Sequence, residues 1–195
     1  MNKQAKISGV ILAGGLARRM NKQDKGLVDF NGQPMIRYAL DAMLPVVDEL
    51  LINANRSHEQ YQAFGYPIIQ DENSNFDGPL AGVYAGLNQC INEVLLVIPC
   101  DSPFITPEGL NELLLAREQH DAEVAVAFDG ERLHPVFFAV KASLKESLKD
   151  YLALGERKID RWIMQHDWVK VDFSAHPEFF ENINTLEQLQ ALAKK

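Results

Sequence analysis

The chain has 195 residues, 47% of them hydrophobic and 24% charged, with a formal net charge of −8. This composition is ordinary for a globular enzyme, and the negative charge argues against an extended nucleic-acid surface, which would need a basic stripe. No apolar run approaches the ~20 residues that span a bilayer, and residues 1–6 lack the apolar region of a signal peptide. We therefore expect a single cytoplasmic domain over residues 1–195 that binds neither nucleic acid nor membrane.

Short apolar runs alternate with helical segments along the chain. Strands are predicted over residues 7–12, 27–30, 49–54, 67–70, 93–99, 122–128, 134–140 and 168–173, the last as an edge strand. Helices are predicted to open at Pro34, to cover 57–61, to open at Pro79 and Pro107, to cover 142–154 and 159–165, and to open at Thr185. This alternation predicts a three-layer α/β fold with a mainly parallel sheet.

The turn after the first strand is the strongest functional signal. Gly14 and Gly15 allow a sharp turn and let bare backbone N–H groups approach a ligand. Four cations follow within eight residues, in a chain that is acidic overall: Arg18, Arg19, Lys22 and Lys25. A strand, a two-glycine turn and a set of cations indicate a polyphosphate site. The alternative is a turn with a solvated basic face.

This turn differs from the commoner phosphate loops. A Walker-type loop needs G-x-x-x-x-G-K-[ST], and the spacing after Gly15 meets Met20 and Asn21 instead. The dinucleotide fingerprint G-x-G-x-x-G is also absent here, because Gly14 and Gly15 are adjacent. The site is therefore predicted to bind a polyphosphate by another arrangement.

The most apolar predicted strand, 93–99, leads to a second candidate residue. Asp101 follows that strand, at the sheet edge where doubly wound folds place their ligands. Because Mg²⁺ takes one or two protein carboxylates together with phosphate oxygens and waters, Asp101 fits the role of a magnesium ligand. The alternative is a turn or cap residue. Cys90 and Cys100 form no C-x-x-C pair, and Cys100 is expected to be a small buried thiol.

The predicted helix that opens at Pro79 is unusually rich in small residues. Gly82 and Gly86 each cost a helix roughly 1 kcal/mol against alanine. Either close packing of the helix on the sheet or a ligand beside the helix requires the small size, and the sequence leaves both alternatives open.

No general base is evident in the sequence. There is no nucleophile elbow and no H-E-x-x-H zinc motif, and His134 is followed by Pro135 in a predicted strand, which favours a structural or substrate-contacting role. If the nucleophile is a phosphate monoester, it needs no base, because its second pKa is near ~6 and it is already largely a dianion at pH 7. Positioning and charge neutralisation would then suffice, which is the usual basis of phosphoryl transfer. The sequence thus describes a nucleotidyl transfer.

The sequence resembles the molybdenum cofactor guanylyltransferases. Its first loop reads Leu12-Ala13-Gly14-Gly15-x-x-x-Arg19-Met20-x-x-x-Asp24-Lys25-Gly26, which is similar to that family's signature. The similarity continues through 52–55, the loop at Asp71, Gly78 to Gly82, 99–103, 129–135, 155–157 and 182–185. The resemblance implies a Rossmann-like nucleotidyltransferase fold that joins GMP from GTP to the terminal phosphate of molybdopterin and releases pyrophosphate.

The resemblance also implies roles for particular residues. Arg19, Lys25 and Asp101 would be catalytic, with Asp101 on Mg²⁺, and the nucleotide would be bound by Leu12, Ala13, Gly14, Gly15, Lys25, Asn53, Asp71, Gly78 and Asp101. Which of Asn53 and Asp71 reads the base stays open. The pterin would lie against the C-terminal half, at Arg157, Asn182 and Asn184. The protein is further expected to be a monomer that makes transient contacts with proteins that mature molybdoenzymes, and to use GTP and molybdopterin as substrates.

Two positions depart from the family pattern, and three alternatives remain. Asn21 stands where glycine is usual, and Leu186 where proline is usual, although asparagine tolerates a left-handed backbone better than most residues. The alternatives are a cytidylyltransferase acting on the same pterin, whose loop reads Leu-Ala-Ala-Gly, a sugar-phosphate nucleotidyltransferase, and a catalytically silent nucleotide-binding or pterin-carrying module. The joint presence of Arg19, Lys25 and Asp101 argues against the silent module.

Overall fold

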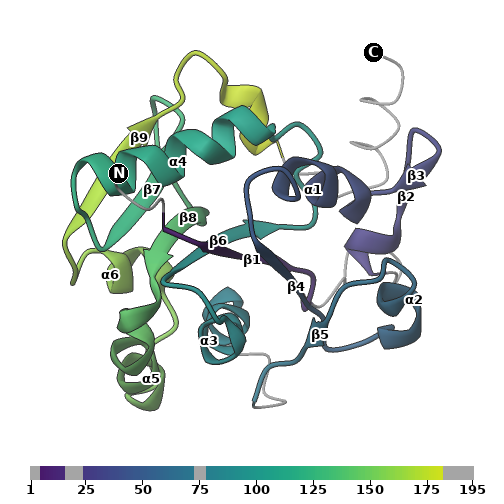
Figure 1. Cartoon of the computed structure of the whole chain (residues 1–195), viewed down its shortest axis with the longest axis horizontal. Coiled ribbons are helices and arrows are strands. Elements are labelled where there is room, and N and C mark those ends of the chain that lie inside the picture. The colour runs from purple at the N-terminus through teal and green to yellow at the C-terminus, as the bar shows by residue number, and fades with distance from the viewer. Residues whose placement is uncertain (1–4, 16–23, 73–77, 182–195) are drawn as a thin grey trace.

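A seven-stranded sheet forms the centre of the computed structural model, which describes residues 5–15, 24–72 and 78–181 (Figure 1). The strand order is β5-β4-β1-β6-β8-β7-β9. The pairings are parallel except for the two that β8 makes, with β6 and with β7. The strands are β1 (Ile7–Leu12), β4 (Glu49–Asn53), β5 (Ile68–Ile69), β6 (Val94–Pro99), β7 (Val124–Phe128), β8 (Leu133–Lys141) and β9 (Trp168–Asp172). The predicted mainly parallel sheet is confirmed.

Helices cover both faces of this sheet, which gives three layers (Figure 1). One face carries α1 (Ile36–Met43) and α4 (Pro107–Gln119), and the other carries α3 (Pro79–Gln89), α5 (Lys145–Ala153) and α6 (Ile159–Ile163). Side chains alternate across a strand, so in β1 Ile11 belongs to the first core and Val10 to the second, both fully buried. Burial on both faces explains why the strands read as continuous apolar runs.

The centre of the sheet contains a topological switch. After β1 the chain passes through α1 to β4 and β5, and it then returns through α3, on the opposite face, to β6 on the other side of β1. Leu12 and Pro99 are register partners at the ends of β1 and β6. Ligands of doubly wound folds bind outside the carboxyl ends of strands at such a point.

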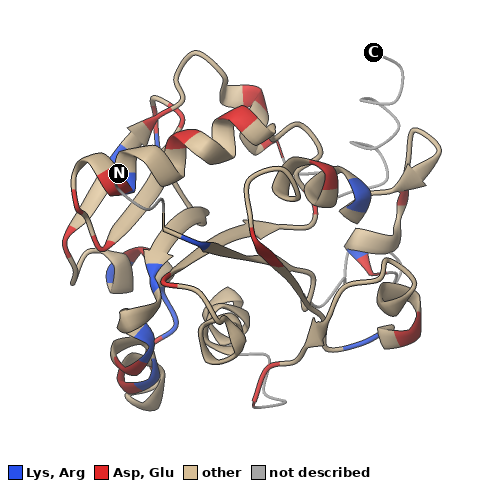
Figure 2. Ribbon diagram, in the orientation of Figure 1, with Lys and Arg blue, Asp and Glu red and all other residues tan. Residues whose placement is uncertain are grey.

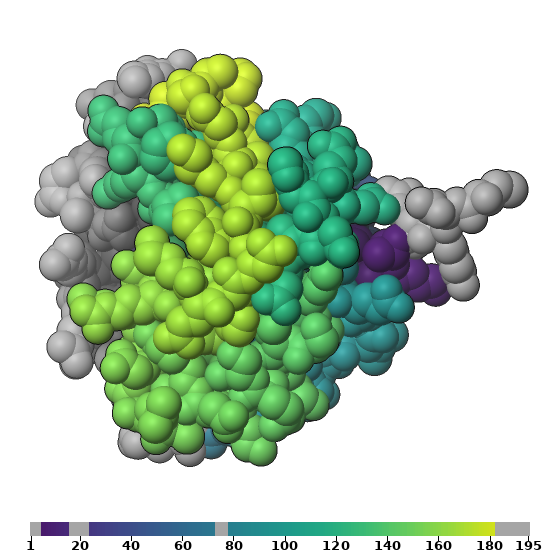
Figure 3. Space-filling model, turned by 90° about the vertical axis from the view of Figure 1, so that its left-hand side faces the viewer, coloured from purple at the N-terminus to yellow at the C-terminus, as the bar shows by residue number. Residues whose placement is uncertain are grey.

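Shorter elements lie beside that edge and at the far end of the sheet. They are the hairpin β2 (Asp29–Phe30) and β3 (Gln33–Pro34), helix α2 (His58–Gln62), and 3₁₀ turns at Lys25–Leu27, Ala142–Leu144 and Pro177–Phe180. The end formed by β9 is built from the last third of the described chain, which gathers on the face that Figure 3 shows in green and yellow. β9 is an edge strand, as predicted.

The prediction that Pro34 opens a helix was wrong. Pro34 pairs with Asp29 in the β2–β3 hairpin, and α1 begins at Ile36. The Asn31-Gly32 turn explains the difference, because both residues have positive φ, 53° and 87°, and such a turn continues into paired strands. The segment 142–154 begins with a 3₁₀ turn before α5. The helix predicted from Thr185 lies outside the described residues.

The glycines of α3 lie in close contact with side chains of the sheet, and the contact is tighter at Gly82 than at Gly86. A Cβ on Gly82 would lie 2.9 Å from Leu12 Cδ2 and 2.9 Å from Asn53 Cγ, and one on Gly86 would lie 3.1 Å from Leu95 Cδ2. Of the two explanations that the sequence left open, helix–sheet packing therefore accounts for both positions.

Charged residues of both signs are distributed over the described ribbon. In Figure 2 acidic and basic positions are interleaved along α5. Among the described residues, no helix is long and apolar enough to cross a membrane.

Candidate functional site

A cavity of about 480 Å³ lies at the carboxyl ends of β1, β4 and β6. Its volume falls in the range of small-molecule sites, about 300–1,000 Å³. The residues that line it are Leu12, Ala13, Gly14, Gly15, Lys25, Asn53, Asp71, Gly78, Pro79, Pro99, Cys100, Asp101 and Val136. Because Gly15 and Asp101 line this same cavity, the two-glycine turn and the acidic residue could contact one ligand.

The two-glycine turn is held against the end of β4. The Ala13 N–H donates to the Asn53 carbonyl at 2.8 Å, which extends the β1–β4 pairing beyond the strand. A Cβ on Gly14 would lie 2.7 Å from Asn55 Nδ2, so this position requires glycine. A Cβ on Gly15 would meet no atom within 4 Å. The backbone at Gly15 therefore faces open space in the cavity rather than packed atoms.

Asp101 and Lys25 form an ion pair in the cavity, with 2.9 Å between Lys25 Nζ and Asp101 Oδ2. Asp101 is only 7% exposed. The Cys100 N–H donates to the Leu12 carbonyl at 3.1 Å, which continues the β1–β6 pairing and carries Asp101 to the sheet edge. A buried carboxylate is tolerated where a cation accompanies it, and Lys25 supplies that charge.

The position of Lys25 depends on its neighbour Gly26. Lys25 begins a 3₁₀ turn in which Gly26 is buried, and a Cβ there would lie 2.8 Å from the Tyr61 hydroxyl and 3.3 Å from Cys100 Sγ. Burial raises the pKa of the Tyr61 phenol and of the Cys100 thiol. Both groups are therefore neutral at pH 7 and act here as packing, which confirms the small buried thiol that the sequence predicted for Cys100.

Asn53, Asn55 and Asp71 form one hydrogen-bonded network beside the turn. Asp71 Oδ1 accepts from Asn53 Nδ2 at 2.9 Å, and Asp71 Oδ2 accepts from Asn55 Nδ2 at 2.8 Å. The Asp71 N–H donates in return to Asn55 Oδ1 at 2.9 Å. Asn55 thus fixes both the backbone and the carboxylate of Asp71, and the network presents polar groups to the cavity from the β4 side.

A divalent cation is compatible with these residues. Among the described ranges, no three His, Cys, Asp or Glu side chains gather as a metal cluster. Mg²⁺ needs no such cluster when it is bound with a polyphosphate, because one or two carboxylates suffice and phosphate oxygens and waters complete the octahedron. Asp101, a nearly buried carboxylate that already holds a cationic partner, therefore fits a magnesium ligand.

The predicted residue Arg157 lies elsewhere in the structure. Arg157 does not line this cavity: its Nη1 donates to the Leu152 carbonyl at 2.9 Å and to the Glu156 carbonyl at 2.7 Å, at the end of α5. Arg157 lines a separate cavity with Glu72, which directly follows Asp71. The predicted residues Arg19, Asn182 and Asn184 lie outside the described residues.

His134 is engaged in a structural contact. Its Nε2 lies 2.6 Å from Asp129 Oδ2, and its ring stacks on Phe180 with 4.2 Å between the centroids. The backbone N–H groups of Arg132 and Glu131, together with His134, hold the pKa of Asp129 well below its usual range. This arrangement agrees with the structural alternative for His134.

The sequence interpretation missed residues that contact the cavity or its walls. Val136 enters from β8 because this reversed strand begins at the edge where β6 ends. Arg56 and Ser57, just after β4, contact Asp24. The only signal for them was their place beyond a buried strand, next to Asn53 and Asn55.

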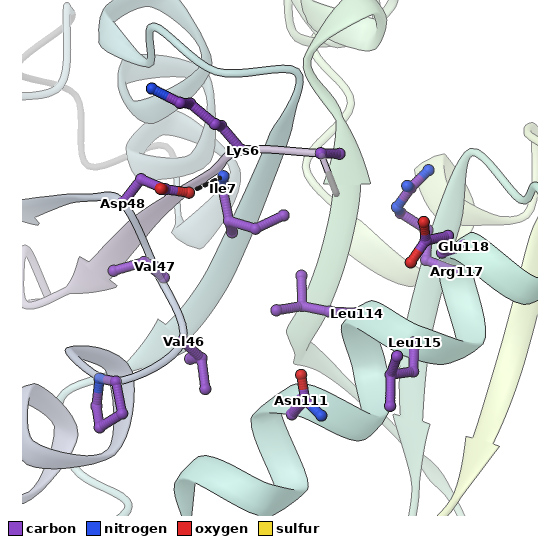
Figure 4. A pocket seen from close by; sticks show the side chains of 12 residues that line it. Lys6, Ile7, Val46, Val47, Asp48, Asn111, Leu114, Leu115, Arg117 and Glu118 are labelled. Atoms are coloured by element: carbon purple, nitrogen blue, oxygen red, sulfur yellow. Dashed lines mark hydrogen bonds between the residues drawn. The ribbon is translucent and has the colours of Figure 1, made fainter. Parts of the chain in front are cut away.

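A second cavity, of about 300 Å³, lies at the opposite edge of the sheet (Figure 4). Residues before β1 and β4 and the face of α4 that carries Asn111 and Leu114 line it. None of the residues predicted for the site lies there, and Lys6 and Arg117 are balanced in it by Asp48 and Glu118. The described residues predicted to bind the nucleotide therefore line the 480 Å³ cavity and not this one.

Comparisons with known proteins place these features in context. The profile of a family described as MobA-like NTP transferase domain matches residues 9–171. A molybdenum cofactor guanylyltransferase of Shewanella loihica is 48% identical over 188 residues, which are 96% of each chain. Another, from Shewanella sp. strain W3-18-1, is 47% identical and covers 98% of this chain and 97% of its own. The crystal structure of molybdopterin-guanine dinucleotide biosynthesis protein A from Archaeoglobus fulgidus has the same fold, with a TM-score of 0.79 at 21% identity over 96% of this chain and 97% of that one.

Proposed function

The chain belongs to the molybdenum cofactor guanylyltransferases, which carry the MobA-like NTP transferase domain, and we propose that it transfers GMP from GTP to the terminal phosphate of molybdopterin. The products would be the guanine dinucleotide form of the cofactor and pyrophosphate. One observation carries the proposal: every nucleotide contact that the family resemblance implies lines the same 480 Å³ cavity, namely Leu12, Ala13, Gly14, Gly15, Lys25, Asn53, Asp71, Gly78 and Asp101.

GTP would lie across the ends of β1, β4 and β6. The phosphates would contact the backbone N–H groups at Gly14 and Gly15 and the Lys25 ammonium group. Turns that present several backbone N–H groups, and cationic side chains, both bind phosphate. The base would lie toward Asn53 and Asp71. Guanine presents N–H donors at N1 and N2, which a carboxylate or carbonyl accepts, whereas adenine would leave such an acceptor unpaired at a cost of about 1–3 kcal/mol.

Asp101 would hold Mg²⁺, which when bound supplies positive charge to the phosphates. In the structure Lys25 stands within hydrogen-bond distance of this carboxylate. Lys25 is therefore placed to stabilise the negative charge that develops on the phosphates during transfer. Arg19 is proposed as a second cation, which would stabilise the leaving pyrophosphate. Stabilisation of developing charge by fixed groups is a large contribution to catalysis.

The transfer itself is a displacement at the α-phosphorus of GTP. An oxygen of the molybdopterin phosphate forms the new P–O bond, and the bond to the β-phosphate oxygen breaks as pyrophosphate leaves. The attacking phosphate is already largely a dianion at pH 7, since its second pKa is ~6. No protein base is required, in keeping with the engagement of His134 by Asp129. Alignment of the two phosphates is then the main task of the cavity.

The acceptor would lie against the C-terminal half of a single domain. Val136, from this half, already lines the cavity, and the proposed pterin contacts are Arg157, Asn182 and Asn184. Arg157 donates to a carbonyl at the end of α5 and lines a cavity together with Glu72. Because Glu72 directly follows Asp71, Arg157 lies near the proposed nucleotide site. We further propose, from the family resemblance, a cytoplasmic monomer that transiently contacts proteins that mature molybdoenzymes.

The test is pyrophosphate release with GTP, CTP, ATP and UTP, each with and without molybdopterin and Mg²⁺. Release with GTP that requires molybdopterin is expected. Release mainly with CTP would identify the cytidylyl alternative, and release that needs a sugar phosphate in place of molybdopterin would identify the other enzyme class. Equal use of ATP and GTP, or GTP binding without release under all conditions, would overturn the guanylyl assignment.

A further inference from the structure

The segment after β4 contacts two points of the signature loop that are nine positions apart in the sequence. Arg56 Nη2 donates to the Gly15 carbonyl at 3.0 Å and to Asp24 Oδ1 at 2.6 Å. The Ser57 hydroxyl donates to the other carboxylate oxygen, Asp24 Oδ2. We propose that Arg56 is a positioning residue, which holds Asp24 against Gly15 and thereby places Lys25 in the nucleotide cavity. This inference rests on the proposed function for the role of Lys25.

Asp24 depends on this contact because it is buried. Its side chain is 4% exposed, whereas that of Arg56 is 33% exposed. A buried carboxylate is tolerated only when hydrogen bonds and an opposite charge compensate it. Arg56 supplies the charge, and Arg56 and Ser57 together satisfy both carboxylate oxygens. A single Arg56 nitrogen has two hydrogens and uses one for each of its acceptors.

The backbone at Ser57 is shaped for the same contact. Ser57 has φ 51°, in the left-handed region that costs a non-glycine residue energy. It precedes α2 in the position of an N-cap, yet its side chain makes no capping hydrogen bond. Its hydroxyl is directed to Asp24 instead. The Ser57 side chain thus bonds to Asp24 and not to the first turn of α2, although its backbone lies in an unfavourable region. This indicates that Ser57 is placed for its contact with Asp24.

The contact between Arg56 and Asp24 influences the position of Lys25 through the backbone of the 3₁₀ turn. The Asp24 carbonyl accepts from the Leu27 N–H at 3.0 Å, which fixes the 3₁₀ turn that begins at Lys25. From this turn Lys25 Nζ reaches Asp101 at 2.9 Å. Without Arg56, the buried Asp24 carboxylate would keep the Ser57 hydroxyl but lose its charged partner. Either Asp24 would move, or its charge would draw the neighbouring Lys25 away from Asp101.

A double-mutant cycle tests this chain of contacts. The variants are Arg56→Met, Arg56→Lys, Lys25→Ala and the double variant Arg56→Met with Lys25→Ala. The matched control is Arg161→Met, at an exposed arginine on α6 that does not line the nucleotide cavity. The readouts are kcat and KM for GTP from pyrophosphate release, the melting temperature, and acetylation of Lys25 by an N-hydroxysuccinimide ester, measured by peptide mass spectrometry relative to Lys170.

Arg56→Met is expected to lower kcat at least tenfold while KM for GTP changes less than threefold. Arg56→Lys, which keeps the charge, should restore most of kcat. In the Lys25→Ala background, Arg56→Met should lower kcat by less than a further twofold, because its effect passes through Lys25. Acetylation of Lys25 should rise at least threefold in Arg56→Met and stay unchanged in Arg161→Met.

The proposal is overturned if the two losses in kcat multiply in the double variant, if Arg161→Met lowers kcat as much as Arg56→Met, or if Lys25 acetylation is unchanged in Arg56→Met. Should the methionine variant fail to fold, Ser57→Ala, which removes only one contact to Asp24, must show the same effects at smaller size. If the wild-type protein releases no pyrophosphate, the proposed function fails, and the acetylation of Lys25 still decides the role of Arg56.

Discussion

Replacement of Gly82 by alanine should destabilise the protein, although the substitution improves helix propensity. Glycine inside a helix costs ~1 kcal/mol relative to alanine, so an unhindered Gly82→Ala would raise stability by that amount. The new Cβ would lie 2.9 Å from Leu12 Cδ2 and also 2.9 Å from Asn53 Cγ. Asn53 cannot move freely, because its amide donates to Asp71. Overpacking at such a position costs about 1–3 kcal/mol.

The packing cost should therefore exceed the gain in helix propensity and leave a net loss of up to about 2 kcal/mol. In a protein of this size a loss of 1 kcal/mol lowers Tm by roughly 2–4 °C. Because the displaced side chains of Leu12 and Asn53 line the nucleotide cavity, GTP affinity should fall as well. Thermal unfolding and equilibrium binding of GTP measure the two effects.

Gly86→Ala is the matched control on the same helix. Its Cβ would lie 3.1 Å from Leu95 Cδ2 and 3.3 Å from Val10 Cγ1, a milder contact that is remote from the cavity-lining Asn53. Its propensity gain and packing cost should nearly cancel, with GTP affinity unchanged. A Gly82→Ala protein that is more stable than wild type and binds GTP equally well would refute the reasoning on close packing.

Further predictions concern the catalytic cations, the pterin side and pH. Lys25→Ala and Arg19→Ala should each lower the transfer rate at saturating GTP, because each removes a cation proposed to neutralise the leaving pyrophosphate. An unchanged single-turnover rate would show that the role assigned to that residue is wrong. Arg157→Ala or Asn182→Ala should weaken molybdopterin binding several-fold with GTP affinity near wild type; loss of GTP affinity alone would mean that the two halves are assigned the wrong way round. Asp129 accepts from the backbone N–H groups of Glu131 and Arg132 at 2.8 Å each, and these and His134 lower its pKa. The stability it contributes is therefore present above its unfolded pKa, near ~3.9, and is lost as the pH falls through the lower folded pKa. Asp129→Asn should thus lower Tm at pH 7, and the difference should shrink toward pH 2; a constant difference would contradict this.

The strands and the mainly parallel sheet were predictable because they follow from hydrophobic periodicity and from the alternation of strands with helices. Ile7 to Leu12 and Val94 to Pro99 are buried on both faces, and such strands read as apolar runs bounded by turn residues. The start of α1 was predicted too early because proline at a first helical position and proline ending a hairpin look alike in sequence. The Asn31-Gly32 pair indicated the turn but not how far the pairing continued.

The candidate site was predictable only where a motif or a strand end carried it. Gly14, Lys25 and Asp101 follow such signals, and the structure brings them to one cavity. The contact of Arg56 with Gly15 and Asp24 joins residues 41 and 32 positions apart, and no local pattern reports a contact at that range. Arg157 was selected from a family motif; in the structure its side chain contacts the end of α5, and its role toward the pterin stays a prediction.

The central claim is that guanylyl transfer occurs in the cavity that contains Asp101. Its most direct test is mass-spectrometric detection of the GMP adduct of molybdopterin, formed from GTP and Mg²⁺ by wild-type protein and by an Asp101→Ala variant with an unchanged circular dichroism spectrum. The account predicts the adduct with wild type and less than a tenth of the rate with the variant, a difference of at least ~1.4 kcal/mol in the barrier. An adduct formed at the same rate by both proteins would contradict it.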